Sequence, residues 1–153
     1  MRLWRISNYA DLSGEGGLRA SGRWHTKGFR VVYFSDHPAS ALLETMVHLE
    51  IDAEDLPDTY QLIGVESPDG SSIKAVEETD LPADWRTQQA VTRALGDAWL
   101  ANAPTPLLSV PSAIVPAGRN YLLNPAHPDA ATISISSAIR AAYDPRLVAF
   151  LKR

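Results

Sequence analysis

A strand-type segment that leads directly into a helix-type segment constrains the fold of this chain most. Residues 31–35 (Val-Val-Tyr-Phe-Ser) combine the β-branched and aromatic side chains that favour a strand. Pro38 then suits a first helical turn, with Ser35 or Asp36 as the cap. Residues 39–50 continue with apolar side chains at helical spacing. A strand followed at once by a helix indicates a mixed α/β domain.

The rest of the chain mixes the same two patterns. Further strands are expected at residues 3–7, 59–66 and 72–76. The last two could pair as a hairpin, because Pro68-Asp69-Gly70 between them has the chemistry of a turn. A helix is expected over residues 85–102, with Asp84 as its cap, and glycine-rich residues 13–17 indicate a loop. Short apolar runs then favour more strand than helix: 107–110, 113–115, 121–123, 132–135 and 147–151.

The length of the chain predicts one domain. A chain of 153 residues can bury a continuous apolar core, and no repeat or low-complexity linker divides it. The expected fold class is therefore α/β of the α+β kind, a single domain on one mixed sheet over residues 1–153.

Composition excludes several classes of protein. The chain has no cysteine, so a disulfide scaffold, a thiolate metal site and a cysteine nucleophile are all excluded. The first residues lack the apolar core of a signal peptide, and no apolar run approaches the roughly 20 residues that span a bilayer. We therefore expect a cytoplasmic protein without a membrane segment.

Charge is distributed unevenly along the chain. Residues 1–48 carry six Arg or Lys against four Asp or Glu, residues 49–85 carry one against eleven, and residues 86–153 carry seven against three. The sequence pI of about 5.5 argues against nucleic acid as a direct ligand. A small anionic ligand between the two basic blocks fits this distribution.

Searches for common chemical motifs leave one group of residues. The sequence has no phosphate-binding loop, dinucleotide fingerprint or nucleophile elbow. Glu44 and His48 share a helix face, but no third ligand stands at a recognisable spacing, so no metal is expected. Arg23, Tyr33 and Glu44 stand out by comparison. A carboxylate at Glu44 among apolar helix neighbours needs a partner, and Arg23 and Tyr33 are the candidates.

The motifs around these residues resemble a known family, the RES-domain toxins of bacterial Xre–RES type II toxin–antitoxin pairs. The resemblance covers nearly the whole chain and lies in a fixed order of motifs: Gly22-Arg23-Trp24, Tyr33, Ala41-Leu42-Leu43-Glu44, His48-Leu49, Val110-Pro111-Ser112-Ala113 and Asn120-Tyr121-Leu122-Leu123-Asn124-Pro125. Many members carry asparagine where this chain has His25.

The resemblance implies a fold and an activity. The fold is expected to be similar to that of ADP-ribosyltransferase toxins. The activity is cleavage of NAD at the nicotinamide–ribose bond, by a glycohydrolase or a phosphorylase, which arrests growth; NAD is the substrate and no metal takes part. Transfer of ADP-ribose to a host protein is one alternative, and a catalytically silent antitoxin-binding module is another. The implied partner is an Xre-type helix-turn-helix antitoxin that covers the active site, and a homodimer within the complex is an open alternative.

The resemblance also assigns roles to residues. Glu44 would stabilise the positive charge on the ribose, and Arg23 would bind the pyrophosphate. Tyr33 would stack on the nicotinamide or a ribose, with its hydroxyl orienting Glu44. Ser112 would bind the nicotinamide amide or cap its own backbone. Trp24 and His25, which flank Arg23, complete the predicted NAD-binding residues.

Each of these residues also has a purely structural interpretation. Glu44 could be an ordinary helix carboxylate, Arg23 could form an ion pair with it, and Tyr33 could belong to the core. The other tryptophans are expected in the core, and Asn120 and Asn124 are expected to fix loops.

Overall fold

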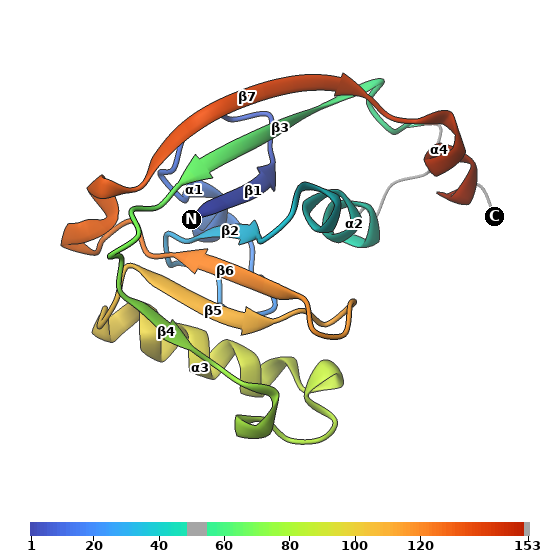
Figure 1. Cartoon of the computed structure of the whole chain (residues 1–153). Helices are drawn as coiled ribbons and strands as arrows, with labels where there is room; N and C mark the ends of the chain where they lie inside the picture. Colours follow the sequence, from blue (N-terminus) through green and yellow to red (C-terminus); the bar gives the residue numbers. More distant parts are fainter. Residues whose placement is uncertain (49–54, 152–153) are drawn as a thin grey trace.

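The sheet is the frame of the molecule (Figure 1). The computed structural model describes residues 1–48 and 55–151, and within them seven strands form one mixed sheet in the order β4-β5-β6-β2-β1-β3-β7. The strands are β1 (Arg2–Ile6), β2 (Val32–Ser35), β3 (Thr59–Glu66), β4 (Ile73–Ala75), β5 (Leu107–Pro111), β6 (Arg119–Leu123) and β7 (Ser134–Ala142). Only β4 and β5 pair in parallel; the other neighbours are antiparallel. The predicted mixed α/β fold class is confirmed.

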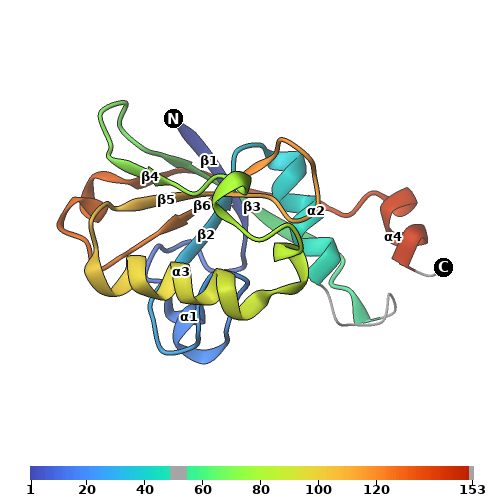
Figure 2. The ribbon, with the colours of Figure 1, turned by 90° about the horizontal axis from the view of Figure 1, so that it is seen from below.

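Helices surround this sheet. They are α1 (Glu15–Arg19), α2 (Pro38–His48), α3 (Gln89–Asn102) and α4 (Pro145–Leu151), with 3-10 turns at Glu78–Asp80, Trp85–Thr87 and Pro128–Thr132. Figure 2 shows α1 and α3 on the same side of the sheet. None of the helices in the described part of the chain is long and apolar enough to cross a membrane.

Two hydrophobic clusters cover the two faces of the sheet. Neighbouring residues of one strand point to opposite faces, and the clusters divide accordingly. Leu108 and Leu122 belong to the cluster that includes Trp24, Trp85 and Trp99, whereas the adjacent residues Leu107 and Leu123 belong to the other. The first cluster packs the sheet against α3, which fixes α3 relative to β5 and β6.

The predicted hairpin between residues 59–66 and 72–76 is wrong. The strands exist as β3 and β4, but they lie near opposite edges of the sheet. β3 pairs with β1 and β7, while β4 pairs with β5. The turn at residues 68–70 forms, with Ser71 N donating to Pro68 O at 3.0 Å. Turn chemistry predicts that the chain changes direction, but not which strand edge it then meets.

The predicted helix over residues 85–102 is interrupted. Residues Trp85–Thr87 form a 3-10 turn, and α3 begins only at Gln89. Asp84 makes no capping bond to the backbone; its Oδ2 accepts from Gln88 Nε2 at 3.0 Å. Trp85 is 1% exposed and packs 6.0 Å from the ring of Trp24. The buried Trp85 ring therefore belongs to this turn and not to α3.

Smaller differences occur elsewhere. The loop predicted at residues 13–17 is partly helical, because α1 begins at Glu15 after Gly14, whose φ of 70° is left-handed. The run 113–115 forms a bend and the run 147–151 lies in helix α4, so neither is a strand. The end of the predicted helix at residues 49–50 lies outside the described residues.

Candidate functional site

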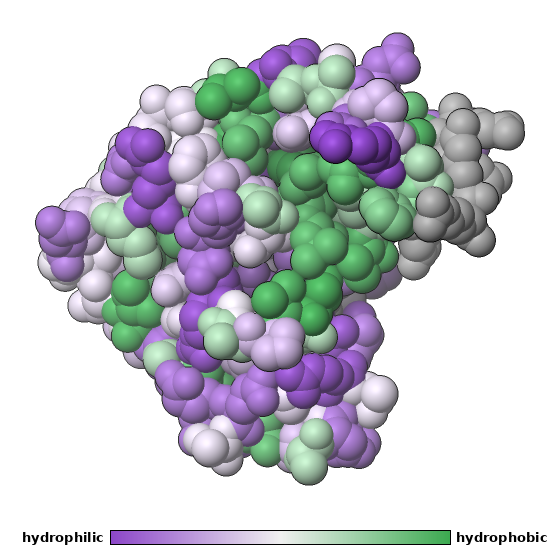
Figure 3. Space-filling view, turned by 45° about the vertical axis from the view of Figure 1, so that its right-hand side comes forward, coloured by the Kyte–Doolittle hydropathy of each residue, from purple (hydrophilic) through white to green (hydrophobic). Residues whose placement is uncertain are grey.

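A cavity of about 850 Å³ is lined mainly by residues between Trp4 and His48, together with Ala113 and Asn120 from later in the chain. Its walls come from β1, the loop before α1, α1 itself, the loop at residues 21–25, β2, α2 and the start of β6. The predicted residues Arg23, Trp24, His25, Tyr33 and Glu44 all line it. Figure 3 shows hydrophobic side chains gathered on the face that carries α2, where Leu43 and Val47 are exposed.

Glu44 is held from two sides. It lies on α2, and its side chain is 21% exposed. Its Oε1 accepts hydrogen bonds from Ser112 Oγ at 3.1 Å and from Asn120 Nδ2 at 2.9 Å. Its Oε2 lies 3.5 Å from His48 Nε2. Because a carboxylate oxygen has two lone pairs, Oε1 is saturated and Oε2 is the oxygen available to a ligand.

Ser112 brings the far end of the chain to this carboxylate. Its Oγ accepts from the backbone N–H groups of Ile114 and Val115, at 3.1 Å each, and donates to Glu44. A hydroxyl has one hydrogen and two lone pairs, so these contacts use it completely. Ser112 is 5% exposed. Of the two predicted roles, the structure shows the backbone cap, joined to a contact with Glu44.

Arg23 reaches the cavity from a loop beside Trp85. Its Nη1 donates to the carbonyl oxygen of Arg86 at 2.9 Å, and its guanidinium carbon lies 5.9 Å from the centre of the Trp85 ring. Burial lowers the pKa of Arg23, and the negative charge of Glu44 partly opposes this. Arg23 and Glu44 therefore attract each other across the cavity, but they form no ion pair within 4.0 Å.

Helix α3 clamps the loop that carries Arg23. Thr92 Oγ1 donates to Arg23 O at 2.6 Å, and Arg93 Nε donates to Gly22 O at 2.8 Å. Two further bonds, from Thr26 N and Oγ1 to the Asp97 carboxylate, measure 2.8 and 2.7 Å. The loop is thus fixed on both sides of Arg23.

Tyr33 on β2 and His25 in the Arg23 loop form a partly buried pair. The Tyr33 hydroxyl donates to His25 Nδ1 at 2.7 Å and accepts from Trp24 N at 3.2 Å. Since the carbonyl of Gly17 can only accept, the hydrogen of His25 lies on Nε2, 3.2 Å from that oxygen. Burial raises the pKa of Tyr33. The prediction that the Tyr33 hydroxyl orients Glu44 is therefore wrong, because the hydroxyl bonds to Trp24 and His25 instead. Only the phenol ring remains to contact a ligand.

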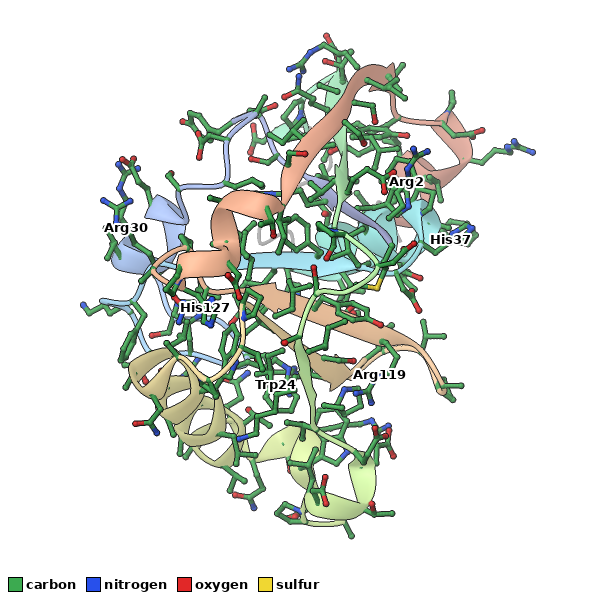
Figure 4. All side chains as sticks on the ribbon, turned by 60° about the vertical axis from the view of Figure 1, so that its left-hand side comes forward. Arg2, Trp24, Arg30, His37, Arg119 and His127 are labelled. Atoms are coloured by element: carbon green, nitrogen blue, oxygen red, sulfur yellow. The ribbon has the colours of Figure 1, made fainter. Side chains whose placement is uncertain are left out.

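Trp24 and His25 support the cavity wall from behind. Their side chains are only 2% and 3% exposed. Trp24 packs against Trp85, and Figure 4 shows it between α3 and the sheet. This burial leaves little of either side chain for direct contact with a bound nucleotide.

Sequence reasoning missed several residues of the site. Asn120 was expected to fix a loop but lies in β6 and contacts Glu44, whereas Asn124 does fix a loop, through Ala126 N at 3.1 Å. Arg5 in β1 also lines the cavity, and burial lowers its pKa. A charged residue inside the strand-type segment 3–7 was the available signal for Arg5, whereas Asn120 precedes the apolar run at residues 121–123. Within the described residues, no group of three or more His, Cys, Asp or Glu is placed to hold a metal.

Comparisons with known proteins give consistent matches. A family model described as RES domain matches residues 2–144. The protein named Toxin Res of Pseudomonas putida is 51% identical over 138 residues, covering 88% of this chain and 92% of the relative. The Prs ADP-ribosylating toxin of Sphingobium sp. is 39% identical and covers 95% of this chain and 96% of its own. A chain of the crystal structure of the M. tuberculosis MbcT–MbcA toxin–antitoxin complex has a similar fold, with a TM-score of 0.71 at 17% identity over 99% of this chain and 88% of that chain.

Proposed function

Since this chain belongs to the RES domain family and is a toxin of a toxin–antitoxin pair, we propose that it breaks the nicotinamide–ribose bond of NAD. The observation that carries the proposal is the carboxylate of Glu44, fixed through Oε1 and open at Oε2 in the wall of a cavity. The cavity volume of about 850 Å³ lies in the range typical of small-molecule and cofactor sites.

Breaking this bond needs a negative charge beside the ribose. The bond between C1′ and the ring nitrogen breaks with its electron pair going to nicotinamide, which leaves as a neutral molecule and needs no proton from a general acid. Positive, oxocarbenium-like charge develops on the ribose, and a preorganised carboxylate stabilises it. In the proposed mechanism, the carboxylate of Glu44 supplies the negative charge through Oε2.

Arginine side chains suit the other end of the substrate. Arg23, Arg5 and Arg19 line the cavity, and a guanidinium binds a pyrophosphate through paired hydrogen bonds. The clamp on the Arg23 loop lowers the entropy cost of holding the group in place. The ring of Tyr33 offers an apolar surface for the nicotinamide or ribose.

The proposed reaction has three forms, which differ in the molecule that accepts the ADP-ribosyl group. Water makes the protein a glycohydrolase, and inorganic phosphate makes it a phosphorylase. The name of the Sphingobium relative, a Prs ADP-ribosylating toxin, favours transfer to a protein as the second candidate. Mass spectrometry of the products, with water alone, with added phosphate and with purified Prs, distinguishes the three.

The partner of this toxin is an antitoxin, and we propose that it is of the Xre helix-turn-helix type and covers the cavity between Arg23 and Glu44. A free NAD-consuming site would harm the cell that makes it, so a bound partner must block NAD entry. The same proposal includes a cytoplasmic location, where NAD is consumed, and a single domain over residues 1–153. It also includes a homodimer of the toxin within the complex. A structure of the complex with the cavity open to solvent would contradict the blocking role.

Nicotinamide release by the purified protein tests the activity. We expect wild type to release nicotinamide from NAD and Glu44→Ala to release it at least about 100-fold more slowly, as for loss of a major electrostatic group. Glu66→Gln is the matched control, because Glu66 is an ion-paired carboxylate outside the cavity, 2.6 Å from Arg2. A wild type that binds antitoxin but never releases nicotinamide would favour the silent-module alternative.

A further inference from the structure

Two polar side chains meet across neighbouring strands beside Glu44. Ser35 ends β2, and Asn120 is its register partner in β6. Ser35 Oγ lies 3.1 Å from Asn120 Oδ1, and Asn120 Nδ2 lies 2.9 Å from Glu44 Oε1. The chain of contacts therefore runs from β2 through β6 to helix α2.

The orientation of the Asn120 amide follows from its two neighbours. A carboxylate oxygen only accepts hydrogen bonds, so Glu44 Oε1 must face the NH₂ end of the amide. The opposite orientation would set two acceptors against each other. Oδ1 then faces Ser35, whose hydroxyl donates; this serine is 4% exposed. The amide is thus fixed at both ends.

We propose that Ser35 and Asn120 form a positioning relay that orients the Glu44 carboxylate and presents Oε2 to the substrate. Ser112 and Asn120 approach Oε1 from the end of β5 and the start of β6, so together they fix the plane of the carboxylate. The relay rests on the proposed function, because it gives two more residues a part in the same reaction. Neither residue needs to touch NAD.

Glu44 has charged and titratable neighbours on several elements. His48 on its own helix and Arg23 in the loop before β2 interact with it directly or through their charge. The same cavity is also lined by Arg5, Tyr9, Asp11, Glu15, Arg19, His25 and Tyr33. Ser35 and Asn120 carry no charge. Replacing Asn120 by alanine removes a hydrogen bond to Glu44, and replacing Ser35 by alanine removes the contact that fixes Asn120; neither changes the charge of the cavity.

The kinetics of single and double variants test the relay. Asn120→Ala should lower kcat for nicotinamide release by about 10- to 100-fold, the range for a lost hydrogen bond to a charged group, with KM changed by less than about threefold. Ser35→Ala should lower kcat in the wild-type background but not in the Asn120→Ala background, because it acts through Asn120. Additive losses, or a wild-type kcat for Asn120→Ala, would overturn the relay.

A matched control separates positioning from folding. Asn124 is 2% exposed and bonds to the backbone of Leu100 and Ala126, away from Glu44. Asn124→Ala should lower Tm but leave kcat of the folded enzyme unchanged.

The pH dependence of kcat in Asn120→Asp distinguishes a positioning role from a purely structural role, which would not make the relative kcat depend on pH. The new carboxyl group donates to Oε1 only when the pair holds a proton, so kcat relative to wild type should rise as pH falls from about 8 to about 5. The same ratio at every pH would contradict the relay.

A measurement without turnover keeps the relay distinct from the proposed function. The side-chain amide protons of Asn120, identified in NMR spectra by their loss in Asn120→Ala, should shift in both Ser35→Ala and Glu44→Gln but not in Asn124→Ala. If wild type releases no nicotinamide, the proposed function fails. The chemical-shift changes still show whether Asn120 contacts both Ser35 and Glu44. Unchanged amide resonances in both variants would refute the relay even in an active enzyme.

Discussion

Thr92→Val removes the central bond of the clamp on the Arg23 loop while keeping the shape of the side chain. Thr92 is 0% exposed, and its Oγ1 donates to Arg23 O at 2.6 Å and lies 3.2 Å from Gln89 O. Valine fills the same space but leaves the partly buried carbonyl of Arg23 without this donor, which costs about 1–3 kcal/mol. For a chain of this length we expect Tm to fall by about 2–10 °C.

The same change should affect substrate binding more than chemistry. A loop released from α3 holds the Arg23 guanidinium less firmly, so KM for NAD should rise about threefold to tenfold with a smaller change in kcat. Thr92→Ser keeps the hydroxyl and should restore KM. Thr132→Val is the matched control, because its hydroxyl donates to Asp129 O at 2.7 Å outside the cavity. If Thr92→Val loses stability but keeps the wild-type KM, the clamp does not position Arg23.

Three further predictions follow from single contacts. Gly22→Ala places a Cβ 2.5 Å from the Tyr33 hydroxyl oxygen, so both Tm and nicotinamide release should fall; unchanged values in a thermal melt and a rate assay would show that the loop can shift freely. Ser112→Ala removes a donor to the site carboxylate and the acceptor for two backbone N–H groups, so kcat should fall by about 10- to 100-fold, measured by nicotinamide release. Hydrogen bonds from Arg146 lower the pKa of Asp144 to about 2, below the ordinary value of 3.8. The stabilisation by these bonds is therefore present above about pH 4 and is lost as pH falls towards 2. In chemical denaturation, the free energies of unfolding of wild type and Asp144→Asn should differ at pH 6 and converge below pH 2.

Local patterns predicted the elements that carry the site. The segment at residues 59–66 became β3 with those bounds, and the strand at 31–35 and the helix from 39 differ from β2 and α2 by one residue at their starts. These segments have strong β-branched or helical patterning, and tertiary packing agrees with it. The hairpin failed because strand pairing depends on distant partners, here β5 and β7, that no local pattern identifies.

The site was predicted only as far as side-chain type and order along the chain allow. Arg23, Tyr33 and Glu44 all line one cavity, and Ser112 reaches Glu44 from a distant segment. The direction of the Tyr33 hydroxyl could not be predicted, because it depends on the fold of the loop at residues 21–25. The role of Asn120 was predicted wrongly for a similar reason: its contact with Glu44 requires the register between β2 and β6.

The rate of nicotinamide release from NAD, measured for wild type and for Glu44→Ala, decides whether Glu44 supports cleavage of the nicotinamide–ribose bond. Circular dichroism must first show that the two proteins share the same fold. We expect wild type to release nicotinamide and the variant to release it at least about 100-fold more slowly. Equal rates for the two proteins, or no release by folded, antitoxin-free wild type, would contradict this expectation.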